Sequence, residues 1–293
     1  MPYVQSGSVT VHFQQSRSRG PVLLLAHGFL MDESMFDPVR KPLTAAGINV
    51  VTWDARGHGG TRAPRDEPFT YWDLAADALT VLNALGIEKA VIGGMSQGGY
   101  AALRTALLAP DRVLGLALLD TEAGACSLPE WTHYRAFFDA WCGQEEPLAL
   151  IAEALAPQLI GGPDPAAWTR WITRWRAGDR RAIRAAAHCL MTRDSVLHRL
   201  PEIEVPALVL RGSLDASSTA IKSAALAYGL PGASGVVTVP DAGHGAVWTH
   251  PELVAPPLLQ LMCRARYEPN DSVVGAVAGH EVRMPRKNWT LPG

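Results

Sequence analysis

Hydrophobic and polar residues alternate in blocks through the first half of the chain. The short apolar runs are rich in branched side chains, which is typical of strands that are buried on both faces. These runs cover residues 22–26, 50–53, 90–93 and 113–119. Segments with helical periodicity separate them, at residues 36–46, 73–85 and 97–109. Strand and helix in this order predict right-handed crossovers and a mostly parallel sheet flanked by helices, an α/β fold.

The two ends of this pattern differ from its middle. Residues 3–6 and 9–14 flank Gly7 and predict an antiparallel hairpin at one edge of the sheet. Residues 121–204 contain no convincing strand but hold five of the nine tryptophans. The alternation then resumes, with strands at 207–210 and 236–239 and helices at 219–228 and 251–262.

We therefore expect one α/β core that carries an insertion. Residues 1–120 and 205–262 form the core, and residues 121–204 form a helical lid inserted late in the sheet. Residues 263–293 fit neither period and form a C-terminal extension of unknown role. This extension could dock on the flank of the sheet or on a second subunit of a homo-oligomer.

Composition narrows the classes of function. The 293 residues are 48% hydrophobic, which is enough for one large core. With 26 basic and 28 acidic residues, the chain has no broad basic field, so nucleic-acid binding is not expected. The first residues do not resemble a signal peptide, and no apolar stretch is as long as a membrane span.

Cysteine usage indicates a reducing compartment. The four cysteines are widely separated and show neither a CxxC pair nor a metal-ligand spacing. They are Cys126, Cys142, Cys189 and Cys263. We expect buried free thiols, a cytoplasmic location and no metal site.

One short segment has a crowding of glycine that an exposed loop does not need. Ser96 lies in Gly94-Met95-Ser96-Gln97-Gly98, between a predicted strand and a predicted helix. A sharp strand-to-helix turn leaves no room for side chains beside the serine, which explains the flanking glycines. The turn lies at the carboxyl edge of the sheet and at the positive end of a helix, where ligands bind. The pattern predicts a nucleophilic serine; the alternative is a helix N-cap in a glycine-rich turn.

A serine hydroxyl needs a base to accept its proton. His244 follows the last predicted strand in a glycine-flanked loop, so it emerges at the same sheet edge as Ser96. His27 and His58 also follow strands, but they lie upstream of Ser96 in segments with other uses. We predict that His244 is the base.

The base in turn needs a carboxylate that orients its ring and stabilises the imidazolium. Asp215 follows strand 207–210, and Asp120 ends strand 113–119 with Glu122 close behind. Both aspartates lie at the required edge. We favour Asp215 because its loop precedes the histidine loop, and Asp120 would then cap or tether the start of the lid.

Acyl transfer also needs N–H donors for the oxyanion. The backbone N–H of Gln97, directly after the serine, is one candidate. The other is the N–H of Phe29, in the loop after strand 22–26, where Gly28 allows a close approach. The alternative for this loop is a simple turn.

Aromatic residues suggest an apolar substrate. Three lid tryptophans share one helical face, which either lines a pocket above Ser96 or packs the lid onto the core. They are Trp168, Trp171 and Trp175. Together with residues flanking the reaction centre, they lead to a predicted substrate-binding set of Met95, Trp168, Trp171 and Trp248. Arg56 is a further candidate, for a substrate carboxylate.

These motifs together resemble the α/β-hydrolase fold superfamily over about residues 1–262. The order Ser96, Asp215, His244 is the order that this family uses. The helical lid resembles the esterase, enol-lactonase and carbon–carbon bond hydrolase branches. The resemblance implies a structural role for His58 and pocket contacts for Asp54 and Arg56.

The resemblance implies hydrolysis of a carboxylic ester or lactone with an apolar acyl or aromatic group, through an acyl-enzyme on Ser96. A serine argues against the haloalkane dehalogenases and soluble epoxide hydrolases of this fold, whose nucleophile is aspartate. No metal or organic cofactor is expected, and the partner is a small-molecule substrate. Carbon–carbon bond hydrolysis, cofactor-free perhydrolysis and a ligand receptor on the same fold are the alternatives.

Overall fold

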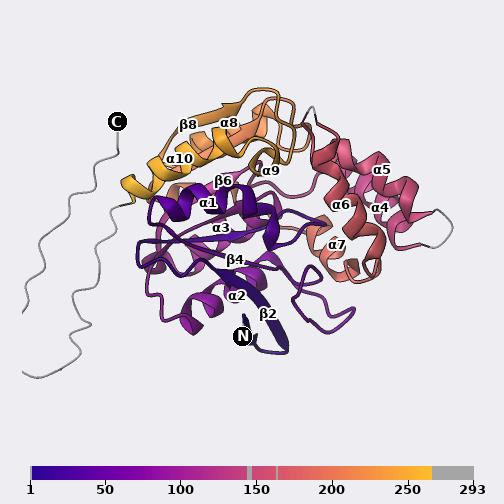
Figure 1. Ribbon diagram of the computed structural model, residues 1–293, viewed down its shortest axis with the longest axis horizontal. Helices are drawn as coiled ribbons and strands as arrows, with labels where there is room; N and C mark the ends of the chain where they lie inside the picture. The colour runs from indigo at the N-terminus through magenta and orange to yellow at the C-terminus, as the bar shows by residue number, and fades with distance from the viewer. Residues whose placement is uncertain (1, 144–146, 163, 266–293) are drawn as a thin grey trace, which may run out of the picture.

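The computed structural model describes residues 2–143, 147–162 and 164–265. Its centre is an eight-stranded sheet with the order β1-β2-β4-β3-β5-β6-β7-β8 (Figure 1). The strands are β1 Tyr3–Ser6, β2 Val9–Gln15, β3 Val22–Ala26, β4 Asn49–Trp53, β5 Ala90–Met95, β6 Val113–Leu119, β7 Ala207–Gly212 and β8 Ala233–Val239. The pairings of β1 with β2 and of β2 with β4 are antiparallel, and the others are parallel. The predicted α/β class and the edge hairpin are confirmed.

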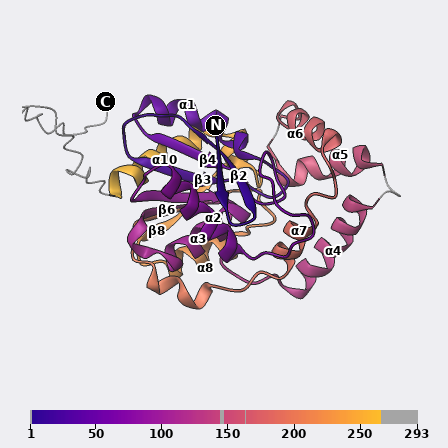
Figure 2. The same ribbon diagram turned by 90° about the horizontal axis from the view of Figure 1, so that it is seen from below.

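Helices cover both faces of this sheet. The helices are α1 Asp37–Ala45, α2 Tyr71–Ala84, α3 Gln97–Leu108, α4 Leu128–Cys142, α5 Leu148–Leu159, α6 Ala166–Ala177, α7 Arg184–Met191, α8 Ala220–Gly229, α9 Ala246–Thr249 and α10 Pro251–Arg264. Short 3-10 helices lie at Glu33–Phe36, Pro110–Arg112 and Leu197–Glu202. Helices α1 and α10 pack on one face, and α2, α3 and α8 on the other (Figure 2).

Burial explains why the central strands were readable from the sequence. Every residue of β3, β4 and β5 is buried, because helices cover both faces of these parallel strands. Strand β8 begins at Ala233, three positions before the predicted 236. The prediction missed its first residues because they are small and lack the branched pattern of the other strands. Pairing with β7 extends β8 beyond the apolar run.

Local signals set the ends of helix α2. Thr70 and Asp73 form a reciprocal capping box, so the helix begins at Tyr71, ahead of the predicted position 73. After the helix, Gly86 adopts a φ of 65°, a left-handed conformation that favours glycine at this position. The helix ends at Ala84, one residue before the predicted position 85.

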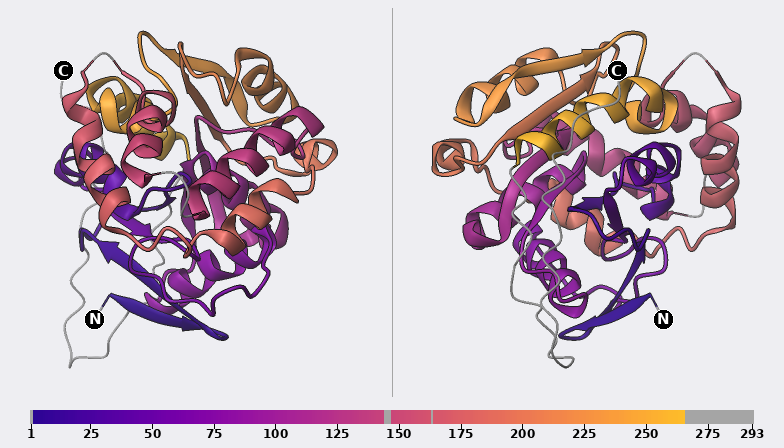
Figure 3. Two further views of the ribbon diagram at one scale, coloured as in Figure 1. Left: turned by 90° about the vertical axis from the view of Figure 1, so that its right-hand side faces the viewer. Right: turned by 60° about the vertical axis from the view of Figure 1, so that its left-hand side comes forward.

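Helices α4 to α7 follow β6 and precede β7, within the residues predicted to form the lid. They pack as two pairs, α4 with α7 and α5 with α6, beside the body that contains the sheet (Figures 1 and 3). Among the described helices, none combines the length and apolar composition that a membrane span requires. Of the predicted C-terminal extension, residues 263 and 264 belong to α10, and residues 266–293 lie outside the described part of the chain.

All four cysteines are free. Cys142 and Cys189 are buried, as the composition predicts, whereas Cys126 is half-buried and Cys263 is exposed. The expectation of free thiols is confirmed, but that of burial holds for only part of the set.

Candidate active site

Ser96 occupies a strained turn between β5 and α3. Its backbone has φ 53° and ψ −113°, a region that side-chain-bearing residues rarely adopt. The end of β6 holds the turn in place: the Ser96 N–H donates to the Leu119 carbonyl (2.9 Å), and the Thr121 hydroxyl donates to the Ser96 carbonyl (2.8 Å). These two hydrogen bonds thus stabilise the strained turn that carries the Ser96 hydroxyl.

The two glycines around Ser96 are required by close packing against β3. A Cβ atom on Gly94 would lie 2.4 Å from the Ala26 carbonyl oxygen, and one on Gly98 would lie 2.0 Å from the same atom. Helix α3 therefore begins directly against the backbone of β3. This explains the glycine spacing that the sequence shows.

His244 and Asp215 form a buried pair. The imidazole Nδ1 lies 2.9 Å from the Asp215 Oδ2 atom, and the other carboxylate oxygen accepts the N–H groups of Ser217 (2.8 Å) and Ser218 (3.0 Å). Burial opposes ionisation of Asp215, but His244 and the two N–H groups more than offset it and lower the pKa of this carboxyl. With Nδ1 engaged, Nε2 is the nitrogen left to act as base. His244 and Ser96 line the same cavity.

Asp120 has a different environment. Its Oδ1 atom accepts the Gly212 N–H (2.7 Å), and its N–H donates to the Leu210 carbonyl (2.7 Å), so it joins the ends of β6 and β7. Complete burial, followed by the nearby charge of Asp215, raises the pKa of Asp120 well above its usual range. Burial thus favours the neutral form of Asp120. The geometry favours Asp215 as the carboxylate that orients His244.

The predicted oxyanion donors lie on the two loops that meet at the elbow. Gln97 is the first residue of α3, so its N–H has no partner within the helix. The loop after β3 turns tightly, with the Met31 N–H donating to the Gly28 carbonyl (3.2 Å). Within the described residues, the N–H of Phe29 makes no hydrogen bond. Neither N–H group has a hydrogen-bond partner within the described residues.

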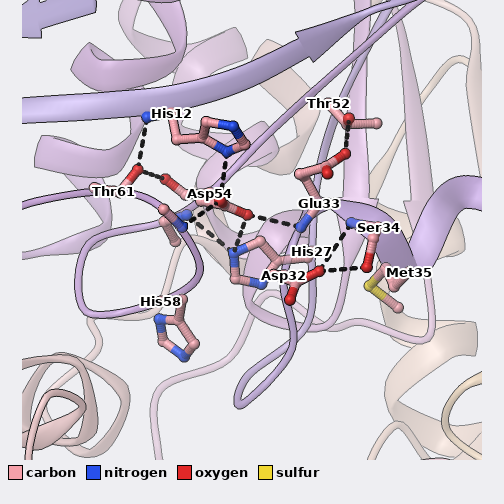
Figure 4. A network of polar contacts seen from close by, with 12 residues as sticks. His12, His27, Asp32, Glu33, Ser34, Met35, Thr52, Asp54, His58 and Thr61 are labelled. Atoms are coloured by element: carbon pink, nitrogen blue, oxygen red, sulfur yellow. Dashed lines mark hydrogen bonds and ion pairs between the residues drawn. The ribbon is translucent and has the colours of Figure 1, made fainter. Parts of the chain in front are cut away.

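A polar network holds the loop after β4 against the oxyanion loop (Figure 4). The buried Asp54 carboxylate accepts the N–H groups of Glu33 and Gly60 (both 2.7 Å) and lies 2.7 Å from His12 Nδ1. The hydrogen bond with Asp54 raises the pKa of His12. Burial lowers the pKa of His27. Its Nε2 atom accepts the Ala55 N–H (3.0 Å), so this ring is neutral.

The roles implied for this loop by the resemblance are partly met. Burial lowers the pKa of His58 to about 3, and its ring packs edge-on against Phe29, consistent with a structural role. Arg56 makes two hydrogen bonds to the buried Asp77 (2.7 and 3.0 Å). The Arg56 guanidinium is thus paired with Asp77 and is not free to bind a substrate carboxylate.

The cavity that contains Ser96 and His244 has a volume of about 460 Å³. Apolar side chains of the lid helices α4 and α5 form one wall. This wall comprises Phe137, Phe138, Leu150, Ile151, Leu155 and Leu159. Tyr100, Glu122 and Tyr134 contribute polar groups to the same cavity. Its chemistry suits a substrate with a hydrocarbon portion beside a reactive carbonyl.

The four predicted substrate-binding residues lie elsewhere. Met95 is fully buried within the core cluster. The Trp168 indole donates to the Gly161 carbonyl (2.8 Å), and that of Trp248 donates to the Ala167 carbonyl (2.9 Å). Trp171 packs edge-on against Trp248 and lines a separate cavity of about 870 Å³. The contacts of Trp248 with Ala167 and Trp171 join α6 to α9, as the packing alternative expects, whereas the Trp168 hydrogen bond lies within the predicted lid. We do not carry the four residues into the substrate site.

Sequence reasoning overlooked the apolar wall although a signal was present. Tyr134, Phe137, Phe138 and Trp141 recur at the spacing of one helical face in residues 121–204. Tyr134, Phe137 and Phe138 line the cavity, while Trp141 is buried within the lid.

Comparison with known proteins identifies the family of this chain. Residues 21–159 match the family model of the alpha/beta hydrolase fold. The human serine hydrolase BPHL is 31% identical over 215 residues, which cover 72% of this chain and 69% of that protein. The structure of a thermophilic esterase from Thermogutta terrifontis has a TM-score of 0.81 at 28% identity and covers 91% of this chain and 98% of its own. The chain belongs to the α/β-hydrolase fold family.

A further relative shows how broad this family is. Fluoroacetate dehalogenase from a Burkholderia species is 38% identical over 168 residues, which cover 55% of this chain and 52% of that protein. This chain therefore spans about half the length of that curated relative. Membership of the family leaves the substrate to be inferred from the site itself.

Proposed function

We propose that this protein is a serine hydrolase that cleaves a carboxylic ester or lactone with an apolar acyl or aromatic group. The observation that carries the proposal is the shared cavity of Ser96 and His244, in which the serine is strained and the histidine contacts the buried Asp215. A serine, a histidine and a carboxylate in these roles define acyl transfer by covalent catalysis. The substrate is a small molecule. The free thiols support a reducing, cytoplasmic setting.

In the proposed reaction, Ser96 Oγ attacks the substrate carbonyl while His244 Nε2 accepts the hydroxyl proton. The N–H groups of Phe29 and Gln97 stabilise the oxyanion of the tetrahedral intermediate. His244 then donates the proton to the departing alcohol, which leaves an ester on Ser96. Water, deprotonated by His244, attacks this ester and releases the acid. Asp215 stabilises the imidazolium in both halves of the reaction.

The nucleophile separates this chemistry from displacement at a saturated carbon. Attack by Ser96 on an alkyl halide or epoxide would leave an ether, which the oxyanion donors and His244 cannot hydrolyse. Attack on a carbonyl leaves an ester, which water can cleave by the same route in reverse. Of these two kinds of reaction, the comparison favours hydrolysis at a carbonyl, as in an ester or lactone.

Covalent labelling tests the proposal. A simple alkyl fluorophosphonate should add once per chain, and mass spectrometry should find the adduct on the peptide that contains Ser96. Protein unfolded in denaturant serves as the control and should remain unlabelled, because activation depends on His244 being nearby. An adduct on another residue, or none at all, would rule out an activated Ser96.

Substitution of each aspartate in turn tests which carboxylate orients His244. Asp215→Asn should lower kcat for a short p-nitrophenyl ester by roughly 10⁴-fold, because the amide no longer stabilises the imidazolium or holds its tautomer. Asp120→Asn keeps the size of a side chain whose burial already favours the neutral form, so it should change kcat by less than about tenfold. Steady-state kinetics on both variants measure this, with thermal unfolding as the check on folding. The reverse order of effects would reassign the acid to Asp120.

A further inference from the structure

The cavity of Ser96 has a polar corner that the proposed reaction does not use. Glu122 follows β6, is 7% exposed and lines the cavity together with Ser96 and His244. A carboxylate beside an apolar wall is costly unless partners compensate its charge. What surrounds Glu122 therefore determines which ligand it can accept.

Two cations hold one of the two carboxylate oxygens. Glu122 Oε1 accepts hydrogen bonds from Arg193 Nη2 and Lys222 Nζ, both at 2.9 Å. Lys222 also pairs with Glu130 on lid helix α4, whose other oxygen lies 3.7 Å from Arg193. Two carboxylates thus face two cations, so the cluster is balanced in charge. It also ties the lid to the core.

The other oxygen is left without a partner. Within the described residues, Glu122 Oε2 makes no hydrogen bond, although the side chain borders the cavity. Its twin already serves both cations, so the cluster does not require Oε2. A carboxylate oxygen is a strong acceptor, and hydrogen bonds to a charged group are worth more than neutral ones.

We propose that Glu122 Oε2 accepts a hydrogen bond from an O–H or N–H group of the substrate and so determines specificity. This rests on the proposed function, because it concerns the substrate that Ser96 attacks. The substrate class is then an ester or lactone with a hydrocarbon portion against α4 and α5 and a hydroxyl or amide N–H beside Glu122. The cavity would then bind the apolar and the polar portion of one substrate at different side chains.

The charge balance selects a neutral donor. An ammonium group would bring an unpaired positive charge into a cavity lined in part by apolar side chains, because Arg193 and Lys222 already neutralise Glu122 and Glu130. A carboxylic acid group, ionised at neutral pH, would be repelled by the free oxygen. A hydroxyl or an amide N–H satisfies Oε2 without adding charge.

Paired covalent probes test this inference. Two alkyl fluorophosphonates of equal chain length are used, one with a hydroxyl on the chain and the other with a methyl ether at the same carbon. The pair is repeated with the substituent at successive carbons. At the best position the wild-type protein should be labelled at Ser96 about tenfold faster by the hydroxyl probe, because only it can donate to Oε2.

The Glu122→Gln variant should lose this preference. Its amide oxygen will accept from Arg193 and Lys222, which turns the NH₂ group toward the cavity, where it cannot accept a hydrogen bond. The labelling-rate ratio of hydroxyl to ether probe should therefore fall to about one or below. Glu130→Gln is the matched control: it removes one carboxylate from the same cluster but does not line the cavity, so the ratio should stay at its wild-type value.

The outcomes separate the two proposals. Equal labelling rates for both probes at every position in the wild-type protein would overturn the role of Glu122, and this measurement requires no variant to fold. An equal loss of preference in both variants would also overturn it, since the cluster as a whole would then be responsible. Failure of both probes to label Ser96 would instead remove the proposed function on which the inference rests.

Discussion

Replacing Ser96 by alanine is expected to lower kcat for a short p-nitrophenyl ester by roughly 10⁴-fold or more, with the fold intact. In the proposed reaction the hydroxyl forms the acyl-enzyme, so its removal takes away the nucleophile. What remains should be the modest rate that binding and the oxyanion donors alone provide.

The same substitution should leave stability almost unchanged. Within the described residues the Ser96 hydroxyl makes no hydrogen bond, and alanine must adopt the same φ of 53° as serine, so the backbone strain stays. We expect the free energy of unfolding to shift by less than about 1 kcal/mol. Initial rates and denaturant unfolding of the variant measure both effects. Undiminished turnover in a folded Ser96→Ala protein would defeat the catalytic assignment.

Replacing Gly98 by alanine should strongly destabilise the fold. The new Cβ would lie 2.0 Å from the Ala26 carbonyl oxygen and 2.6 Å from its carbon, and neither backbone atom can move without separating α3 from β3. We expect a loss of about 3 kcal/mol or more in the free energy of unfolding. Activity should also fall, because β3 leads to Phe29 and α3 begins at Gln97, so the two oxyanion donors would move apart.

Gly86→Ala is the matched control for this prediction. Gly86 has a φ of 65°, but nothing lies within 4 Å of the Cβ that alanine would add. Only the left-handed conformation is penalised, at about 1 kcal/mol. Denaturant unfolding of both variants, with one m-value used for both, measures the difference between their losses in free energy of unfolding. Equal losses would show that conformation, and not the contact with Ala26, makes Gly98 necessary.

The central sheet could be predicted because its signals are local. Parallel strands covered on both faces read as continuous apolar runs, and β3, β4 and β5 are buried at every position. The turn at Ser96 was equally readable, since the glycines that flank it are neighbours in the chain. The predicted range of β8 was too short, because the first residues of this strand depend on pairing with β7 for their conformation.

The lid was predicted as a helical insertion, but its surfaces were not. An amphipathic helix shows the same periodicity whether its apolar face covers a core or lines a cavity. Trp171 and Phe138 both belong to such faces, yet the first packs against Trp248 and the second borders the cavity of Ser96. The difference lies in how the helices are placed on the sheet.

The amino-acid sequence by itself determined the α/β class, the strained turn at Ser96 and the short set of residues from which a triad could be drawn, because each depends on neighbours along the chain. Only the tertiary structure decided that Asp215 contacts His244 while Asp120 joins the ends of β6 and β7. It also decided that α4 and α5 line the cavity, and that Glu122 keeps one oxygen free. These outcomes depend on distances between segments remote in sequence, which packing of the whole chain sets.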